Sequence, residues 1–272
     1  MAYRDLFKGT GKYYAKYRPG YPKEFFADVI KKFTLDGTGR LFDLGCGTGQ
    51  LAIPLAPFFK EVIAMDPEPE MLQEGKTQAK KAKTRNIQWI RGSSENLSPR
   101  IGKFKLVVMG RSFHWMDRNR VLRKLYKMIE PGGGIVVVAE HDVIPSTRIR
   151  WKKAIKKVVQ KYLGEERRAG SGIYKRPKDK HQVVIASSPF KKSRIINYKE
   201  IRMWTIPQIL GHLYSTSFSS RAVLGKNRVP FEKDLKQILK TINRKGHFIE
   251  RVNVEAIYVR KPKTRDESRR PR

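Results

Sequence analysis

Three glycines at alternate positions, followed by a carboxylate, have the spacing in this sequence that best fits a chemical site. Gly45, Gly47 and Gly49 come directly after the short apolar run 40–44. Where a turn carries no side chains, a ligand can rest against the backbone. Asp66 ends the next apolar run, 21 positions after Gly45. A carboxylate at this distance lies beside the ribose of a nucleoside placed over the turn and accepts hydrogen bonds from its hydroxyls. The pattern predicts a nucleoside-binding slot.

Two other interpretations of these residues stay open. A GxGxxG fingerprint for a dinucleotide pyrophosphate needs glycine at position 50, where this chain has Gln50, so that version is disfavoured. Asp66, which Pro67 follows, could instead only cap the next helix. Cys46 is the only cysteine, so neither an intramolecular disulfide nor a cysteine-based metal cage can form, and we expect no metal site. Cys46 itself fits the turn as a small residue.

Apolar runs and amphipathic stretches alternate around this turn. We expect strands over 40–44, 62–66, 87–90, 106–109 and 135–139, and helices over 24–33, 51–59, 71–83 and 121–129. This alternation predicts a parallel sheet with helices on both faces. Further along the chain we expect helices over 151–163, 207–214 and 231–243, strands over 195–198 and 254–259, and an exposed loop over 164–182.

The charge of the chain is strongly and unevenly positive. The net charge is +34 over 272 residues, with +11 in residues 1–140 and +23 in residues 141–272. Such a field attracts nucleic acid, anionic membranes or acidic substrates, although a generally basic surface without a dedicated partner fits the same numbers. No apolar stretch approaches the roughly 20 residues that cross a bilayer, and the first 20 residues lack the apolar core of a signal peptide. We therefore expect a soluble cytoplasmic protein.

Several motifs resemble those of one enzyme family. Residues 43–49, Asp-Leu-Gly-Cys-Gly-Thr-Gly, resemble motif I of the class I S-adenosylmethionine-dependent methyltransferases. The likeness is to the small-molecule group, methyltransferase type 11, which includes ubiquinone/menaquinone and trans-aconitate methyltransferases. Residues 92–97 resemble the adenine-binding stretch after the third strand, 112–117 the loop after the fourth strand, and 130–134 the turn before the fifth strand. The resemblance covers residues 13–140.

The resemblance implies a cofactor, S-adenosyl-L-methionine, and the residues that hold it. Arg18, in a Tyr/Arg-Pro arm that closes over the cofactor in part of this group, is assigned to the methionine carboxylate, a pairing with good geometry. Ser93 stands where Asp is common in the family, which implies a weaker adenine contact, and Lys105 replaces an Asp ahead of the fourth strand. The predicted cofactor-binding residues are Tyr14, Arg18, Asp43, Gly45, Cys46, Gly47, Gly49, Asp66, Pro67, Met71, Ser93, Ser94, Glu95 and Arg111.

The acceptor side is predicted less directly. In this family a nucleophile on the substrate attacks the sulfonium methyl in line, so positioning dominates, with a base where the nucleophile carries a proton. His114 lies at the carboxyl edge of the fourth strand and is the predicted catalytic residue, as base or substrate anchor. Alternatively, it only packs between Phe113 and Trp115. The predicted substrate-binding residues are Tyr17, His114, Trp115, Trp204 and Tyr214, the last two in a segment, 202–218, that resembles a cap.

Together these features predict a Rossmann-like, doubly wound α/β sheet of about seven strands, mostly parallel with a C-terminal antiparallel strand, plus a helical cap. The expected divisions are an N-terminal arm or lid (1–22), an S-adenosylmethionine-binding core (23–140), a helical cap with the last sheet strands (141–259) and a disordered basic tail (260–272). The predicted function is methyl transfer to a small organic acceptor under the cap, in a monomer or homodimer whose surface attracts polyanions non-specifically.

Two alternatives to that function remain. The chain could methylate RNA or a protein held by the basic surface, although it has no recognisable RNA-binding module and no Asn-Pro-Pro-Tyr-like motif after the fourth strand. It could also be a binding protein that kept the cofactor fold and lost turnover.

Overall fold

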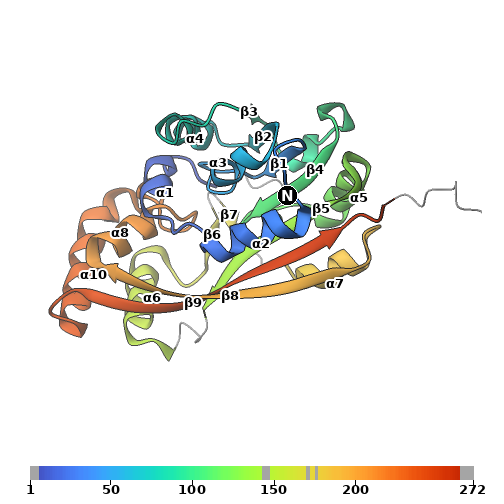
Figure 1. Cartoon of the computed structure of the whole chain (residues 1–272). Helices are drawn as coiled ribbons and strands as arrows, with labels where there is room; N and C mark the ends of the chain where they lie inside the picture. The colour runs from blue at the N-terminus through green and yellow to red at the C-terminus, as the bar shows by residue number, and fades with distance from the viewer. Residues whose placement is uncertain (1–5, 143–147, 170–171, 175–176, 264–272) are drawn as a thin grey trace, which may run out of the picture.

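In a computed structural model of the chain, the described residues are 6–142, 148–169, 172–174 and 177–263 (Figure 1). The first part of the chain contains α1 (Gly11–Tyr17), α2 (Lys23–Phe33), β1 (Arg40–Leu44), α3 (Ala52–Leu55), β2 (Glu61–Asp66), α4 (Pro69–Lys81), β3 (Ile87–Arg91), β4 (Phe104–Gly110), α5 (Arg118–Met128) and β5 (Ile129–Asp142). The second part contains α6 (Arg150–Leu163), β6 (Arg168–Ala169), β7 (Gly172–Ile173), α7 (His181–Ala186), β8 (Ser193–Thr205), α8 (Ile206–Tyr214), α9 (Arg221–Leu224), α10 (Arg228–Ile242) and β9 (His247–Arg260).

One seven-stranded sheet forms the centre of the molecule, in the order β3-β2-β1-β4-β5-β9-β8. Strands β1 to β5 are paired in parallel, and β9 runs antiparallel to both of its neighbours. The predicted fold class is therefore confirmed, including the antiparallel strand near the C-terminus. Because β1 stands between β2 and β4, the turns after β1, β2 and β4 meet at one edge of the sheet, where open α/β sheets bind ligands.

Two apolar layers cover the sheet. One layer joins α2, α3 and α4 to one face through residues such as Phe25, Leu55 and Leu72. The other joins α5 and α7 to the opposite face through Leu122, Leu125 and Ile185. Burial on both faces explains why the inner strands read as unbroken apolar runs in the sequence.

Strands β8 and β9 continue together beyond the main sheet as a two-stranded ribbon. Strand β5 pairs with β9 only from Val252 onward, whereas β8 pairs with β9 from His247. Figure 1 shows both strands running on past the sheet toward α8 and α10. A third apolar cluster lies there and joins the ribbon to α6, α8 and α10 through Trp204, Phe231 and Phe248. This cluster is the core of the cap.

Several boundaries differ from the sequence-based expectation. The sequence suggests strands over 195–198 and 254–259, whereas β8 and β9 are much longer. The sequence signal is short because inward positions of the ribbon carry polar residues, such as Glu200 and Arg202, that hide the alternation. Strand β5 starts at Ile129 and includes the glycine run 130–134, across which its pairing with β4 shifts register. The expected loop 164–182 contains the β6–β7 hairpin and the start of α7, elements too short to give a periodic signal.

The ends of the chain are described only in part. Residues 1–5 of the expected arm and 264–272 of the expected tail lie outside the described residues. Within the described part, no helix combines the length and apolar character that spanning a bilayer would require. The division into arm, core, cap and tail stays a prediction.

Candidate cofactor and acceptor site

The turn after β1 has left-handed backbone at all three of its glycines, with φ of 75° at Gly45, 52° at Gly47 and 85° at Gly49. Packing against the protein accounts for two of them. A Cβ at Gly45 would overlap the Ser112 side chain, and a Cβ at Gly49 would lie 2.7 Å from the Trp89 ring. Packing within the protein thus already requires glycine at Gly45 and Gly49, and contact of these two residues with a ligand stays a prediction.

Gly47 is the glycine of this turn at which an added Cβ would overlap no protein atom. The nearest atoms to a Cβ there belong to the Tyr14 ring, at 3.6 Å, and Tyr14 lies on α1 of the arm rather than on the core. Between the turn and the arm lies a cavity of about 10 Å³, room for about one water molecule. An adenosyl group resting on Gly47 would require the Tyr14 side chain or the arm to move aside.

Asp66 faces the glycine turn from the end of β2. Its Oδ2 accepts a hydrogen bond from the Gly47 amide at 2.8 Å, and its Oδ1 accepts one from the Glu68 amide at 2.9 Å. Burial raises the pKa of this carboxyl, and the two amide bonds counteract that shift. The residue at the N-cap of α4 is Glu68 and not Asp66. The carboxylate is thus fixed against the turn, and the simple capping interpretation does not describe it.

Asp43 carries the only carboxylate oxygen that is buried without a partner among the described residues. Its Oδ2 accepts from the Ala52 amide at 3.0 Å, while Oδ1 has no hydrogen-bond partner. Burial raises the pKa of Asp43 to about 8. Asp43 also lines the small cavity at the turn, together with Cys46. A buried carboxyl with a spare acceptor is suited to a cationic or hydrogen-bond-donating group of a ligand.

The expected adenine side lies next to Asp66. Gly92, after β3, donates its amide to the Asp66 carbonyl at 3.1 Å, so the stretch with Ser93, Ser94 and Glu95 begins beside the end of β2. Burial alone would raise the pKa of Glu95, but hydrogen bonds from the two serine hydroxyls outweigh it and lower the pKa. Two further predicted residues flank Asp66 along the chain: Pro67 is exposed and Met71 is buried at the start of α4.

The arm is held by both the core and the cap. The Gly9 amide donates to Glu70 Oε2 at 2.7 Å, on the core side. Arg18 lies over the Tyr14 ring, 5.1 Å from its centroid, and its Nη2 donates to the Ser215 carbonyl at 3.4 Å, on the cap side. The Nε of Arg18 is buried without a partner among the described residues. This orphaned donor is available to the ligand carboxylate that the resemblance implies.

Arg111, a predicted cofactor residue, contacts the arm and the end of β5. Its Nη1 donates to Gln50 Oε1 at 3.0 Å, and its Nη2 donates to the Pro19 carbonyl at 3.0 Å and to Glu140 Oε2 at 3.1 Å. The guanidinium also lies over the Tyr21 ring, 4.6 Å from the centroid. Both terminal nitrogens thus donate to protein groups, whereas the Nε of Arg111 is buried without a partner in the part of the chain that the structure describes. Arg111 positions the arm, and its contact with the cofactor stays a prediction.

His114 and Trp115 lie beside Tyr174, the residue that follows β7. The centroid of the His114 ring lies 4.7 Å from that of Trp115 and 6.3 Å from that of Tyr174. The Trp115 and Phe7 ring centroids are 6.5 Å apart, and Phe7 belongs to the arm. Burial and the neighbouring cations lower the pKa of His114 to about 4. The imidazole is thus neutral at physiological pH, suited to hydrogen bonding and weak as a base.

Trp204 and Tyr214 each donate a hydrogen bond to a glutamate. The indole N–H of Trp204 donates to Glu250 Oε2 at 2.7 Å, and the Tyr214 hydroxyl donates to Glu232 Oε1 at 2.6 Å. Each contact is within the cap. Tyr17, also predicted to bind substrate, packs on α8, where a Cβ at Gly211 would overlap its ring.

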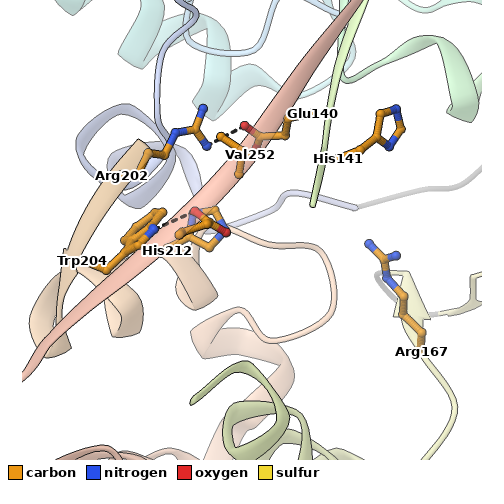
Figure 2. Close-up of a pocket in the computed structure, with 8 residues that line it drawn as sticks. Glu140, His141, Arg167, Arg202, Trp204, His212 and Val252 are labelled. Carbon is orange, nitrogen blue, oxygen red and sulfur yellow. Dashed lines mark hydrogen bonds and ion pairs between the residues drawn. The ribbon is translucent and has the colours of Figure 1, made fainter. Parts of the chain in front are cut away.

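A cavity of about 350 Å³ lies between the end of β5, the ribbon and α8 (Figure 2). On one side the Arg202 guanidinium donates to Glu140 Oε2 at 2.7 Å. On the same side, two residues along β8, the Trp204 indole N–H donates to Glu250, and Figure 2 shows Arg167 lying opposite these groups. The Nδ1 of His212 is buried without a partner among the described residues, and burial lowers the pKa of His212 to about 3. The lining residues are Glu140, His141, Arg167, Arg202, Trp204, His212, Glu250 and Val252.

Sequence reasoning missed most of this cavity. Trp204 was predicted, but Glu140, Arg202 and His212 were not. Glu140 ends the apolar part of β5 at the ligand-binding edge, which is a signal that the sequence does contain. Arg202 and His212 lie inside the segment singled out as a cap, but nothing in the linear sequence shows that they face β5.

Comparison with known proteins supports the assignment that this geometry suggests. Residues 41–133 match the methyltransferase domain family. An uncharacterized methyltransferase-like protein of Schizosaccharomyces pombe is 28% identical over 152 residues, which is 55% of this chain and 56% of that protein. Trans-aconitate 2-methyltransferase of Deinococcus radiodurans is 32% identical over 108 residues, 38% of this chain and 39% of that enzyme. The matched part thus spans about half or less of these two relatives.

Solved structures agree on the fold. Phosphoethanolamine N-methyltransferase 2 of Haemonchus contortus, in complex with phosphomonomethylethanolamine and S-adenosylhomocysteine, superposes with a TM-score of 0.57 at 14% identity, over 97% of this chain and 61% of that one. At this identity the likeness concerns the fold alone. Together with the glycine turn, Asp66 and the strand order, these matches support a methyltransferase of the class I, S-adenosylmethionine-dependent type.

Proposed function

We propose that this protein transfers the methyl group of S-adenosylmethionine to a small organic acceptor bound in the cavity between β5, the β8–β9 ribbon and α8. The observation that carries the proposal is the placement of two sites at one edge of the sheet. The Gly47–Asp66 contact lies at the ends of β1 and β2, and the 350 Å³ cavity starts at Glu140, at the end of β5. Ligands of open α/β sheets bind at this edge.

The residues around the turn fit the cofactor. Asp66 is fixed where it can accept from ribose hydroxyls, since each carboxylate oxygen has a second lone pair besides the one given to a backbone amide. The orphaned Oδ1 of Asp43 is suited to the amino group of the methionine part, and the orphaned Nε of Arg18 to its carboxylate. Ser93, Ser94 and Glu95 would contact the adenine.

The cavity supports a small polar acceptor. Its volume of about 350 Å³ lies at the lower end of the range for ligand pockets of roughly 300 to 1,000 Å³. Its wall includes Arg167 and also His212, whose Nδ1 has no partner within the part of the chain that the structure describes. The similarity to a trans-aconitate methyltransferase supports an acceptor of the small-molecule class.

The chain's own groups would mainly position the reactants. The cofactor supplies an activated methyl group, and the arm, through Tyr14 and Arg18, would exclude water from it. His114 is neutral and does not line the cavity itself. Tyr174, which it contacts, lies under Arg167 at 4.6 Å. We therefore assign His114 to positioning of the acceptor wall ahead of a role as general base.

Titration calorimetry with S-adenosylmethionine and S-adenosylhomocysteine tests the cofactor half of the proposal. Gly47→Val should abolish binding, because the new side chain would occupy the place where the adenosyl group is proposed to rest once the Tyr14 side chain or the arm has moved aside. Asp66→Ala should weaken it by roughly 1 to 3 kcal/mol, the range for losing hydrogen bonds to a charged group. Asp36→Ala is the matched control, because Asp36 is an exposed carboxylate before β1 and accepts hydrogen bonds only from Thr38 among the described contacts. Absence of heat with both ligands in the wild type would refute the assignment.

An acceptor screen with methyl-labelled cofactor tests the other half. Small organic acids and amines should be labelled, and His212→Ala should lower that labelling without changing the affinity for S-adenosylhomocysteine. Label found only in RNA or in protein, unaffected by His212→Ala, would instead support an acceptor held on the basic surface.

A further inference from the structure

One face of the β8–β9 ribbon exposes large aliphatic side chains. Ile201 is 70% exposed, Met203 66% and Ile249 58%. Met203 and Ile249 are direct cross-strand partners, and Ile201 lies two residues along β8 from Met203. Because alternate residues of a strand share a face, the three side chains form one continuous apolar group on the outside of the ribbon.

Among the described residues, the helices of the cap cover the opposite face of the ribbon and leave this face exposed. Trp204 and Phe248, which alternate with the exposed residues, are buried in the cap core. The exposed group also lies beyond the part of β9 that pairs with β5, where the ribbon extends toward α8 and α10 (Figure 1). It therefore projects from the body of the molecule, away from the cavity and the glycine turn.

Basic side chains flank this apolar group at both ends. Lys199 precedes Ile201 on the same face of β8, and Arg251 is the direct partner of Ile201 on β9. At the other end, Arg244 and Lys245 are exposed in the turn that leads into β9. Within the described segments 199–205 and 247–253, the outward-facing positions carry no acidic residue, whereas the acidic residues there, at 200 and 250, alternate to the inward face.

Aliphatic residues between cations match one kind of surface better than others. Nucleic acid attracts the cations but gains little from bare Ile and Met, since it is bound through phosphates and aromatic stacking. An anionic bilayer satisfies both parts, because lipid headgroups attract Lys and Arg while the interface accepts apolar side chains. The net charge of +23 in residues 141–272 acts in the same direction. We propose that the outer face of the β8–β9 ribbon, centred on Ile201, Met203 and Ile249, docks this protein on an anionic lipid surface.

Vesicle flotation tests the proposal with the full chain. The protein should float with vesicles of phosphatidylcholine mixed with phosphatidylserine and stay in solution with phosphatidylcholine alone. Met203→Ser and Ile249→Ser should each lower partitioning roughly ten-fold, the effect of removing one buried aliphatic side chain from the interface. Lys199→Glu should lower it at least roughly five-fold. Val229→Ser on α10, where Val229 is 66% exposed, and Lys80→Glu on α4 are the matched controls and should change nothing.

Two results would overturn the proposal. If Lys199→Glu and Lys80→Glu weaken flotation equally while Met203→Ser has no effect, the attraction is a diffuse property of the whole basic surface. If light scattering shows a dimer that Met203→Ser dissociates, and neither kind of vesicle binds, the ribbon face is an interface between two copies. Because all the variants are remote from the glycine turn, unchanged S-adenosylhomocysteine affinity separates this test from that of the proposed methyl transfer.

Discussion

Replacement of Glu140 by glutamine should destabilise the fold more than any other single charge removal near the cavity. The Glu140 carboxylate accepts from Arg111 at 3.1 Å and from Arg202 at 2.7 Å, and the three side chains are 19%, 9% and 9% exposed. Burial alone would raise the pKa of Glu140, but the two guanidiniums outweigh it and lower the pKa from 4.5 to about 2. At about 1.4 kcal/mol per pKa unit this corresponds to about 3 kcal/mol.

The burial of Glu140 with Arg111 and Arg202 leads to an effect of the same size. Glu140→Gln keeps the shape of the side chain but leaves two buried guanidiniums without their shared counter-charge, which typically costs about 3 to 5 kcal/mol. For a chain of this length, a loss of about 3 kcal/mol lowers the melting temperature by roughly 6 to 12 °C. Arg111 also holds the Pro19 carbonyl, so we expect the variant to bind S-adenosylhomocysteine more weakly as the arm loosens.

The pH dependence supplies a second readout. Because the pKa of Glu140 is lowered in the folded state, the ionised carboxylate adds to the free energy of unfolding. This stabilisation is fully present above pH 4.5 and is lost as the pH falls from 4.5 toward 2. The difference in stability between wild type and Glu140→Gln should therefore be largest at neutral pH and shrink across that acid range.

Urea denaturation and thermal melting, followed by circular dichroism, measure both effects. Glu200→Gln is the matched control, because Glu200 bonds the same Arg202 at 2.7 Å but its side chain is 34% exposed. An ion pair this close to solvent should cost at most about 1 kcal/mol. If Glu140→Gln is as stable as Glu200→Gln, or if its deficit does not depend on pH, the reasoning about the buried pair is wrong.

Three further predictions concern the turn, the arm and the histidine beside the acceptor wall. Gly45→Ala should lower the free energy of unfolding by at least about 1 kcal/mol, because φ is 75° and the added Cβ overlaps Ser112; Gly20→Ala, with open space around it, should be neutral in the same denaturation experiment. Arg18→Lys should weaken S-adenosylhomocysteine binding in calorimetry while the melting temperature stays unchanged, because lysine keeps the charge but lacks the orphaned Nε donor. Since the pKa of His114 is lowered to about 4, stability should fall as the pH drops from 6.5 to 4; His114→Asn should flatten that fall in thermal melts, and an unchanged slope would contradict the assignment.

The cofactor half of the molecule was predictable because its signals are local. The strand that ends at Leu44, the glycine turn and Asp66 lie within 27 residues, and the right-handed connections of a parallel sheet bring them together in only one way. Even here the sequence did not reveal the role of each glycine. Gly45 and Gly49 are required by Ser112 and Trp89, which are distant in the chain.

The acceptor cavity could not be predicted because its walls come from segments far apart in the sequence. Glu140 and Arg202 are separated by 62 positions and meet only because β9, the last strand, inserts between β5 and β8. A sequence pattern reports which face of its own strand a residue occupies, but not which strand lies beside it. The polar inward positions of β8 therefore hide the full length of the strand from a sequence pattern.

Glu140 joins these two halves in a way that bears on the order of binding. Through Arg111 the carboxylate is connected to the arm that lies over the glycine turn, and through Arg202 it forms one wall of the cavity. Moving the arm far enough to admit an adenosyl group would strain the Arg111 contacts with Pro19 and Glu140 and leave Arg202 to hold the carboxylate alone. Since any coupling between two sites is reciprocal, a ligand that fixes Glu140 from the cavity side should tighten the arm. An acceptor found in the screen should therefore raise the affinity for S-adenosylhomocysteine in the wild type, and this increase should disappear in Glu140→Gln.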